Sequence, residues 1–249
     1  MIILRSDKEI GQIRKAGLIV AMVLDKLKRS AKPGIGTNEL DRIALEEILK
    51  NGGLPAFKDY KGYPANICVS INEGVVHGIP SERKLKDGDI VSIDVGVKSG
   101  SYFADAAITV GVGNISDKAR KLMKVTEESL YSGIGNARPG KRLSDISANV
   151  QECVEKNGFS VVRSFVGHGI GEKIHEEPEI PNFGKPGKGP RLDSGMILAI
   201  EPMVNEGGHD IEILPDGWTA ITKDRSLSAH FEHTVVVRDG GAEILTALS

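Results

Sequence analysis

Residues 88–97 read Gly-Asp-Ile-Val-Ser-Ile-Asp-Val-Gly-Val, and residues 195–204 read Gly-Met-Ile-Leu-Ala-Ile-Glu-Pro-Met-Val. Both stretches place an acid, Asp94 or Glu201, at the end of an apolar run. Three further matches follow in the same order along the chain: Ala31-Lys-Pro-Gly34 with Ala137-Arg-Pro-Gly140, Asn51-Gly52 with Asn157-Gly158, and Asp105-Ala-Ala-Ile-Thr-Val with Glu232-His-Thr-Val-Val-Val. One such match could be chance, but an ordered series predicts a fold made of two related halves.

Each half begins with a helical pattern and continues with short strands. Apolar residues recur at three- and four-residue steps between Ile10 and Leu27, which predicts an amphipathic helix. Further helices are expected at 37–49, 116–137 and 144–157, with Asn51-Gly52-Gly53 ending the first of these. Runs rich in β-branched residues predict strands at 90–97, 106–112, 197–200 and 234–238.

This order of elements favours an α+β fold. Helices would cover one face of a largely antiparallel sheet, and a site would lie on the opposite face between the halves. The chain has 249 residues, which is long for one domain and short for two separate cores. We therefore expect a single catalytic domain, 1–249, with internal halves at about 8–113 and 114–245.

The composition describes an ordinary globular chain, with 40% hydrophobic and 27% charged residues and a net charge of −2. It gives no sign of a nucleic-acid partner, because there is no strong positive charge and aromatic residues make up only 4%. The apolar run at 18–24 is too short to span a bilayer, and the charged start of the chain does not resemble a secretory signal. Two cysteines without C-x-x-C spacing fit a reducing compartment, so we expect a cytoplasmic protein.

Four acids occupy matched positions in the halves. Asp94 and Glu201 end apolar strand segments, while Asp105 and Glu232 precede later ones. A single acid of this kind is as often explained by a salt bridge or a solvated strand face. Four acids that the repeat brings to one point would repel one another, and such a cluster requires cations.

A histidine joins this set. His168 lies between glycines in Gly167-His-Gly-Ile-Gly171, where the backbone can approach closely. One nitrogen with several carboxylate oxygens suits Mn, Fe(II), Co or Zn better than calcium. Four carboxylates are too many for one catalytic zinc, so two bridged divalent ions, with a water activated between them, fit better.

Two more histidines are candidates for contact with a substrate. His77 lies in Asn72-Glu-Gly-Val-Val-His77-Gly-Ile-Pro, and His175 follows His168 by seven residues. Each could donate a hydrogen bond to a substrate amide or a developing oxyanion, although an isolated histidine is more often structural. We expect His209, His230 and His233 to be structural.

Taken together, these motifs resemble those of the type I methionine aminopeptidases. The resemblance rests on the Asn72–Pro80 segment, Asp94-Val-Gly, Asp105, the segment from His168 to His175-Glu, Ile200-Glu-Pro-Met, Asp216-Gly-Trp-Thr and Phe231-Glu-His-Thr, and it covers nearly the whole chain. It implies the pita-bread fold, in which two pseudo-symmetric halves form a curved antiparallel sheet covered by helices. It also implies metal-dependent removal of the initiator methionine from nascent chains, by a metal-bridging hydroxide that attacks the scissile carbonyl.

The resemblance also implies residue roles. Asp94 would bind one metal ion, His168 and Glu201 the other, and Asp105 and Glu232 would bridge them. Glu201 would move the proton, His77 would lie beside the scissile bond, and His175 would stabilise the oxyanion. The methionine pocket would contain Tyr60, Tyr63, Cys68 and Trp218, an apolar slot that suits a thioether.

Some features depart from the family or stay open. Ile174 stands where an aromatic residue is common, and Gly74 where a larger residue is common. The alternatives are a proline-specific aminopeptidase or prolidase, which usually carries a large N-terminal domain, and a non-catalytic binding module, which would lack the ligands. We expect a monomer. Which metal is used, and whether the enzyme docks on the ribosome, are left open by the sequence.

Overall fold

The computed structural model describes residues 2–248, and its four long helices are the elements that the sequence predicts. Helix α1 begins after Ser6, whose hydroxyl and backbone form a capping box with Glu9. Its buried stripe includes Ile10, Val20 and Leu27, which confirms the predicted apolar face. The helices are α1 (Asp7–Ser30), α2 (Thr37–Lys50), α3 (Asp117–Ile134) and α4 (Leu143–Glu155).

The strands form four hydrogen-bonded groups, and every pairing is antiparallel. In the first half, β4 pairs with β5 along ten residues, from Ile90 opposite Gly111 to Ser99 opposite Tyr102. In the second half, β9 pairs with β14 and β7. The strands and the 3-10 turn η1 are β1 (Leu54–Pro55), η1 (Tyr60–Gly62), β2 (Cys68–Ile71), β3 (Gly74–Val76), β4 (Ile90–Ser99), β5 (Tyr102–Gly111), β6 (Ser160–Val161), β7 (Gly167–Gly169), β8 (Glu176–Ile180), β9 (Ile197–Ile200), β10 (Met203–Asn205), β11 (Ile211–Ile213), β12 (Ala220–Thr222), β13 (Ser228–His230), β14 (His233–Val236) and β15 (Glu243–Ile244).

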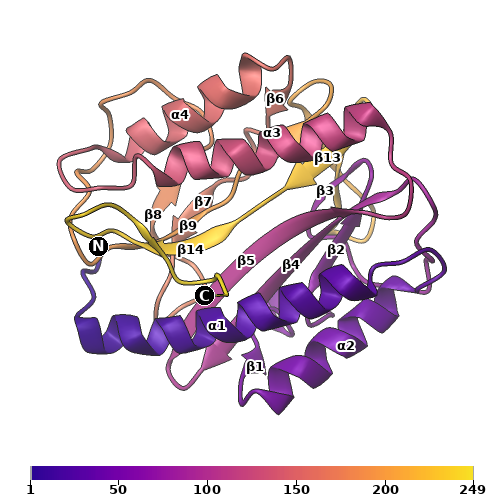
Figure 1. Cartoon of the computed structure of the whole chain (residues 1–249), viewed down its shortest axis with the longest axis horizontal. Helices are drawn as coiled ribbons and strands as arrows, with labels where there is room; N and C mark the ends of the chain where they lie inside the picture. Colours follow the sequence, from indigo (N-terminus) through magenta and orange to yellow (C-terminus); the bar gives the residue numbers. More distant parts are fainter. Residues whose placement is uncertain (1, 249) are drawn as a thin grey trace.

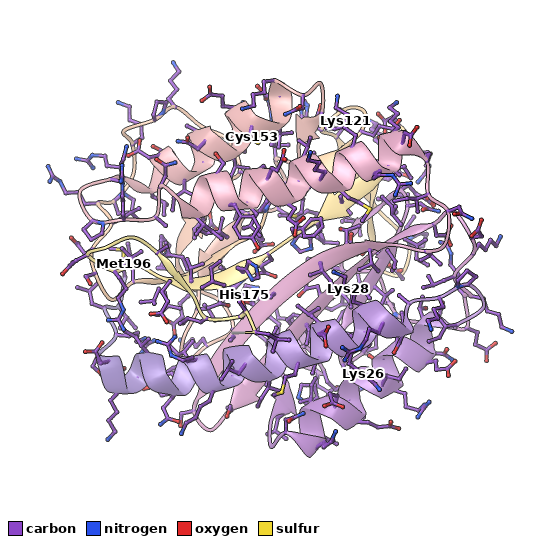
Figure 2. The ribbon with its side chains drawn as sticks, in the orientation of Figure 1. Lys26, Lys28, Lys121, Cys153, His175 and Met196 are labelled. Atoms are coloured by element: carbon purple, nitrogen blue, oxygen red, sulfur yellow. The ribbon has the colours of Figure 1, made fainter. Side chains whose placement is uncertain are left out.

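The expected α+β architecture is present. Figure 1 shows α1 and α2 over the strands of the first half and α3 and α4 over those of the second, with all four helices on the same side. The apolar core lies between these two layers. The outer helix faces carry charged side chains, such as Lys26 and Lys28 on α1 and Lys121 on α3 (Figure 2).

The halves meet at β5 and the segment before β14. The Glu232 N–H donates to the Ala107 carbonyl at 2.9 Å, and the Thr109 hydroxyl bonds to the backbone of His230. This seam brings Glu232 close to Asp105, because Asp105 lies two residues from Ala107 on β5.

The predicted strand bounds differ from the observed ones by no more than two residues, except at the start of β5, where the difference is largest. The sequence predicts a strand at 106–112, whereas β5 begins at Tyr102. A tight turn at Gly100, where φ is +61°, folds the chain back directly after Ser99. Pairing therefore starts four residues earlier, and Asp105 lies inside the strand. Among the described residues, no helix has both the length and the apolar character that crossing a membrane requires.

Candidate metal centre

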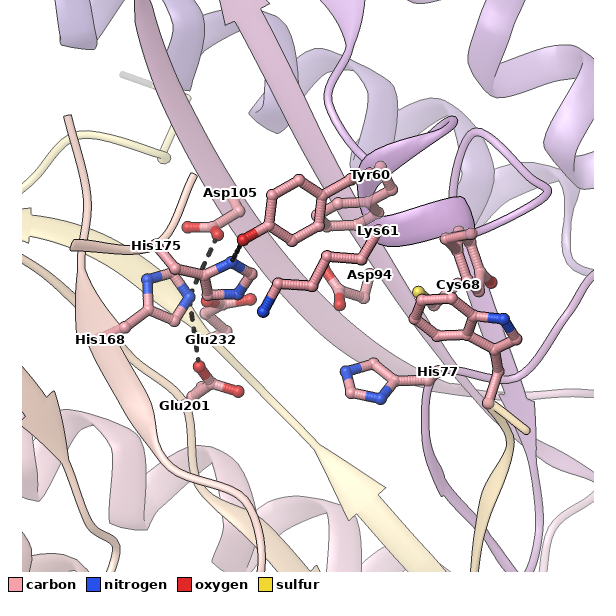
Figure 3. Close-up of a pocket in the computed structure, with 13 residues that line it drawn as sticks. Tyr60, Lys61, Cys68, His77, Asp94, Asp105, His168, His175, Glu201 and Glu232 are labelled. Carbon is pink, nitrogen blue, oxygen red and sulfur yellow. Dashed lines mark hydrogen bonds and ion pairs between the residues drawn. The ribbon is translucent and has the colours of Figure 1, made fainter. Parts of the chain in front are cut away.

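The four matched acids come together at the seam between the halves. Asp94 lies in β4, opposite Cys68 of β2, and Asp105 lies in β5. Glu201 follows β9 directly, and Glu232 precedes β14. All four line one cavity of about 240 Å³, together with His168 of β7 (Figure 3).

His168 lies within reach of the acids of both halves. Its Nε2 atom is 3.5 Å from Asp105 Oδ2 and 3.5 Å from Glu201 Oε1. Donor atoms of Asp105, His168 and Glu232 all lie within 4.8 Å of one another. The fold thus brings together the histidine and the acids that the sequence predicts to converge.

The orientation of His168 leaves one ring nitrogen free for a ligand. Its Nδ1 atom is 2.9 Å from the Gly169 carbonyl oxygen, so Nδ1 carries the hydrogen and donates it there. Burial lowers the pKa of His168 to about 4, which keeps the ring neutral at physiological pH. The lone pair of Nε2 then faces the carboxylates, as in histidine ligands whose other nitrogen is fixed by a carbonyl.

In the described part of the chain, the carboxylates have no lysine or arginine partner to balance them. Within residues 2–248, no lysine or arginine forms an ion pair with any of the four. Burial and the neighbouring carboxylates raise the pKa values of Asp94, Glu201 and Glu232, and burial raises that of Asp105 to about 7. Asp94 Oδ1 is also buried without a hydrogen-bond partner. A cluster of this kind fits divalent cations, since they would satisfy the oxygens and remove the repulsion.

The rest of the cavity is largely aromatic. Tyr63 and Trp218 contact each other edge to face, with ring centroids 5.1 Å apart, and Cys68 packs beside Tyr63. Burial raises the pKa of the Cys68 thiol well above its ordinary value, so this side chain stays protonated. The six residues that the sequence predicts to contact substrate all line the cavity: Tyr60, Tyr63, Cys68, His77, His175 and Trp218.

His175 and His77 approach the acids from different elements. His175 Nδ1 is 2.9 Å from the Tyr60 hydroxyl, and its ring centroid is 4.3 Å from that of His168. His77 follows β3 with φ of +58°, in the left-handed region that few residues other than glycine adopt. Its ring lies edge-on to Phe165. Figure 3 shows His175 beside Asp105 and Glu232, and His77 farther from these carboxylates.

Three site residues were not predicted from the sequence. Phe57 and Lys61 line the cavity, although only their neighbours in the Tyr60–Tyr63 segment were singled out. His230 is buried, and its Nε2 atom lies 3.7 Å from Glu201 Oε2 without a hydrogen-bond partner. The spacing of two residues between His230 and Glu232 could have indicated it, because residues two apart in an extended segment share a face.

The remaining expectations concern residues outside the cavity. His233 bonds through Nδ1 to the Thr246 hydroxyl, and His209 lies 3.5 Å from Asp210. Ile174 packs into the largest apolar cluster of the core. A Cβ atom at Gly74 would lie 2.9 Å from the Ile71 nitrogen, so a larger residue there would require the backbone to shift.

Comparisons with known proteins agree over the whole chain. Residues 11–239 match the model of metallopeptidase family M24. A methionine aminopeptidase of Clostridium perfringens is 56% identical over 248 residues, and methionine aminopeptidase 1 of Bacillus subtilis is 54% identical over 246 residues; each alignment covers 99% or more of both chains. The crystal structure of methionine aminopeptidase from Thermotoga maritima superposes with a TM-score of 0.98 at 46% identity and covers all of both chains. A prolidase of Pyrococcus horikoshii shares the fold, with a TM-score of 0.81 at 22% identity over 65% of its length.

Proposed function

The chain belongs to metallopeptidase family M24, and we propose that Asp94, Asp105, His168, Glu201 and Glu232 hold the metal ions with which it works. It is 54–56% identical to methionine aminopeptidases over its full length, and it is a hydrolase that removes N-terminal methionine. The observation that carries the metal proposal is the uncompensated charge at the seam, where buried carboxylates face one neutral histidine nitrogen.

We propose two divalent ions, drawn from Mn, Fe(II), Co and Zn. The donor set offers one imidazole nitrogen and carboxylate oxygens from four side chains, which exceeds the needs of one ion. When bound, such ions would lower the pKa of a water molecule toward neutrality and polarise the scissile carbonyl. Asp105 and Glu232 are the bridging candidates, because they lie at the seam where the halves hydrogen-bond to each other.

Glu201 and His175 are proposed to transfer the proton and to stabilise the developing negative charge. Glu201 is the proposed acceptor of the proton from the attacking water and its donor to the leaving amine. His175 Nδ1 lies 2.9 Å from the Tyr60 hydroxyl, and we assign the hydroxyl as the donor, which leaves the His175 proton on Nε2 to stabilise the developing oxyanion. His77 lines the same cavity apart from His175 (Figure 3) and is proposed to bond with the substrate amide.

The aromatic end of the cavity is the proposed methionine pocket. Phe57, Tyr63 and Trp218 surround the Cys68 thiol, and the Tyr63 hydroxyl is anchored to backbone carbonyls at 2.9 and 3.1 Å. A flexible thioether makes favourable contacts with aromatic edges and a soft thiol. Because the Cys68 pKa is raised, we assign this residue to packing and not to nucleophilic attack.

We further propose that the substrates are nascent chains and that the enzyme acts on them in the cytoplasm as a monomer, in proximity to ribosomes. Newly made proteins begin with methionine there, and both cysteines of the chain are free and buried, as in proteins of a reducing compartment.

The deciding experiment uses metal-stripped protein reloaded with Mn, Co or Fe(II). Hydrolysis of Met-Ala-Ser is compared with that of Ala-Pro-Ala, and the bound metal is counted per chain by elemental analysis. Release of methionine alone with two ions bound is the expected result. Cleavage before proline would instead indicate prolidase activity. Inactivity with every metal would point to a binding module, and one tightly bound ion at full activity would contradict the two-ion proposal.

A further inference from the structure

His175 lies on an irregular loop with open space on both sides. The His175 loop (residues 171–176) joins β7 to β8, and its first five residues belong to neither a helix nor a strand. One groove beside it contains Lys61 and Glu179, and a second hollow contains Ala56 and Phe103. Ile174 packs into the core, but the residues around it face open space, and His175 must keep a contact of 2.9 Å to the Tyr60 hydroxyl.

The carboxylate of Glu176, the residue after His175, closes the loop on itself. Its Oε1 atom accepts the backbone N–H groups of Glu172 at 2.7 Å and Lys173 at 3.0 Å. The backbone adds two bonds, from Gly171 N–H to the Lys173 carbonyl and from Phe103 N–H to the Gly171 carbonyl. Ile174 fixes the loop on the core side, and Glu176 fixes the backbone of residues 172 and 173 on the outer side.

Arg5, from the segment before α1, holds Glu176. Its Nη2 atom lies 2.8 and 2.9 Å from the two carboxylate oxygens of Glu176. The Arg5 side chain is only 3% exposed. It lies against Gly171, where a Cβ atom would be 2.5 Å from the guanidinium. Its backbone N–H donates to the Gly195 carbonyl, which ties the segment to the second half.

We propose that Arg5 is a positioning residue for His175. The proposal rests on the proposed role of His175 in the reaction. In the described part of the chain, Arg5 is the cation that pairs with Glu176, and its Nη1 atom lies 3.3 Å from Glu9 of α1 and 3.6 Å from Glu172 of the same loop. It therefore joins the start of the first half to the loop that carries His175 in the second.

Loss of the guanidinium would release the loop. Glu176 is only 12% exposed in its side chain, and without Arg5 its charge would be poorly compensated. The carboxylate would turn toward the neighbouring groove and draw residues 172 and 173 with it, because it holds their N–H groups. A displacement of about 1 Å at a catalytic group lowers rates by about 100-fold.

Arginine suits this position better than lysine. The flat guanidinium presents several N–H groups in a fixed fork, so it reaches Glu176 and Glu9 together. An ammonium group is a single point charge and would reach one of them. Arg5→Lys should therefore restore only part of what Arg5→Met loses.

The first test measures kcat and KM of Arg5→Met on Met-Ala-Ser with saturating metal. We expect kcat to fall by about 10- to 100-fold, with KM for the peptide and the number of bound metal ions unchanged. Arg14→Met is the matched control, because Arg14 also joins α1 to the second half, through Glu243, but does not contact the His175 loop. It should keep wild-type kcat. A normal kcat in Arg5→Met, or a change in KM or metal content alone, would overturn the proposal.

The second test asks whether Arg5 acts through His175. In a His175→Ala background, adding Arg5→Met should cause no further loss of kcat, since the residue it positions is already gone. Amide hydrogen exchange should also show faster exchange at residues 172 and 173 in Arg5→Met, but not in Arg14→Met. A full additional loss in the double variant would show that Arg5 acts elsewhere and would overturn the proposal.

A conservative variant guards against a general folding defect. Glu176→Gln keeps an oxygen for the two backbone N–H groups but loses the charge that pairs with Arg5, and it should give a smaller fall in kcat in the same direction. Wild-type kcat in this variant would contradict the proposal. Wild-type kcat in His175→Ala would exclude the proposed function of His175 and the Arg5 proposal with it. A low kcat in His175→Ala together with wild-type kcat in Arg5→Met would exclude the Arg5 proposal only.

Discussion

Replacing Thr234 with valine should weaken metal binding without removing a ligand. Thr234 is fully buried in β14, and its hydroxyl oxygen accepts the Asp105 N–H at 3.1 Å. Thr234 Oγ1 also lies 2.8 Å from the Asp105 carbonyl oxygen and 3.0 Å from Asp105 Oδ1, and both of these oxygens can accept its hydrogen. Thr234 is therefore the side chain that holds Asp105 in place across the seam.

The size of the effect follows from these contacts. A hydrogen bond to a charged group contributes about 1.5–3 kcal/mol. Since about 1.4 kcal/mol corresponds to a tenfold change in an equilibrium constant, Thr234→Val should raise the metal Kd by about 10- to 100-fold. The loss of an acceptor for the buried Asp105 N–H should also lower the free energy of unfolding by about 1–3 kcal/mol.

Titration calorimetry with Mn or Co measures the affinity, and Thr246→Val supplies the control. Thr246 is equally buried and bonds to the Thr234 N–H and to His233, but it contacts none of the four carboxylates. Its substitution should lower stability and leave the metal Kd unchanged. Equal metal affinity in Thr234→Val and the wild type, or equal weakening in both variants, would refute the argument that Thr234 fixes a ligand.

Three other predictions concern the acids and the substrate. Glu232→Gln should reduce kcat by at least about 100-fold at saturating metal, because the proposed bridge would lose a charged oxygen; near-normal turnover would exclude the bridging role. The metal-free protein should lose stability as pH rises from about 4 to 7, because burial raises the folded-state pKa of Asp105 to about 7. In this pH range the folded chain holds a proton that the unfolded chain releases. Chemical denaturation at several pH values measures this change, and a gain in stability with rising pH would contradict it. Peptides with a small second residue, such as Met-Ala-Ser, should be cleaved faster than Met-Lys-Ser, because side chains wall the cavity; equal kcat/KM values would argue against this.

The sequence predicts the long helices and the convergence of the four acids. The helices follow from the spacing of apolar residues, and the convergence follows from the repeat between the two halves. The helices extend over at least 13 residues each, which gives several turns for an apolar stripe to repeat. Asp94 and Glu201 could be matched because the apolar strands before them have the same pattern. The roles of the five proposed ligands remain predictions that metal-binding experiments must test.

The short strands and several site residues could not be predicted in the same way. Strands β6 and β10 contain two and three residues, too few for an alternating pattern. Phe57 and Lys61 enter the cavity because η1 turns through left-handed residues at Asp59 and Lys61, a local geometry that composition does not reveal. The bond between Arg5 and Glu176 joins residues 171 positions apart, so only the tertiary fold brings them together.

The proposed metal centre and the seam between the halves should depend on each other. The backbone bond from Glu232 to Ala107 joins the halves, and the same pairing brings Glu232 and Asp105 close enough to repel. Each half on its own would bury fewer like charges, so assembly of the halves creates the electrostatic cost. Divalent ions at this point would offset that cost only when both halves are in place. Metal affinity and the stability of the seam should therefore change together in variants such as Thr234→Val, whereas variants of the distant Arg14–Glu243 pair should alter stability alone.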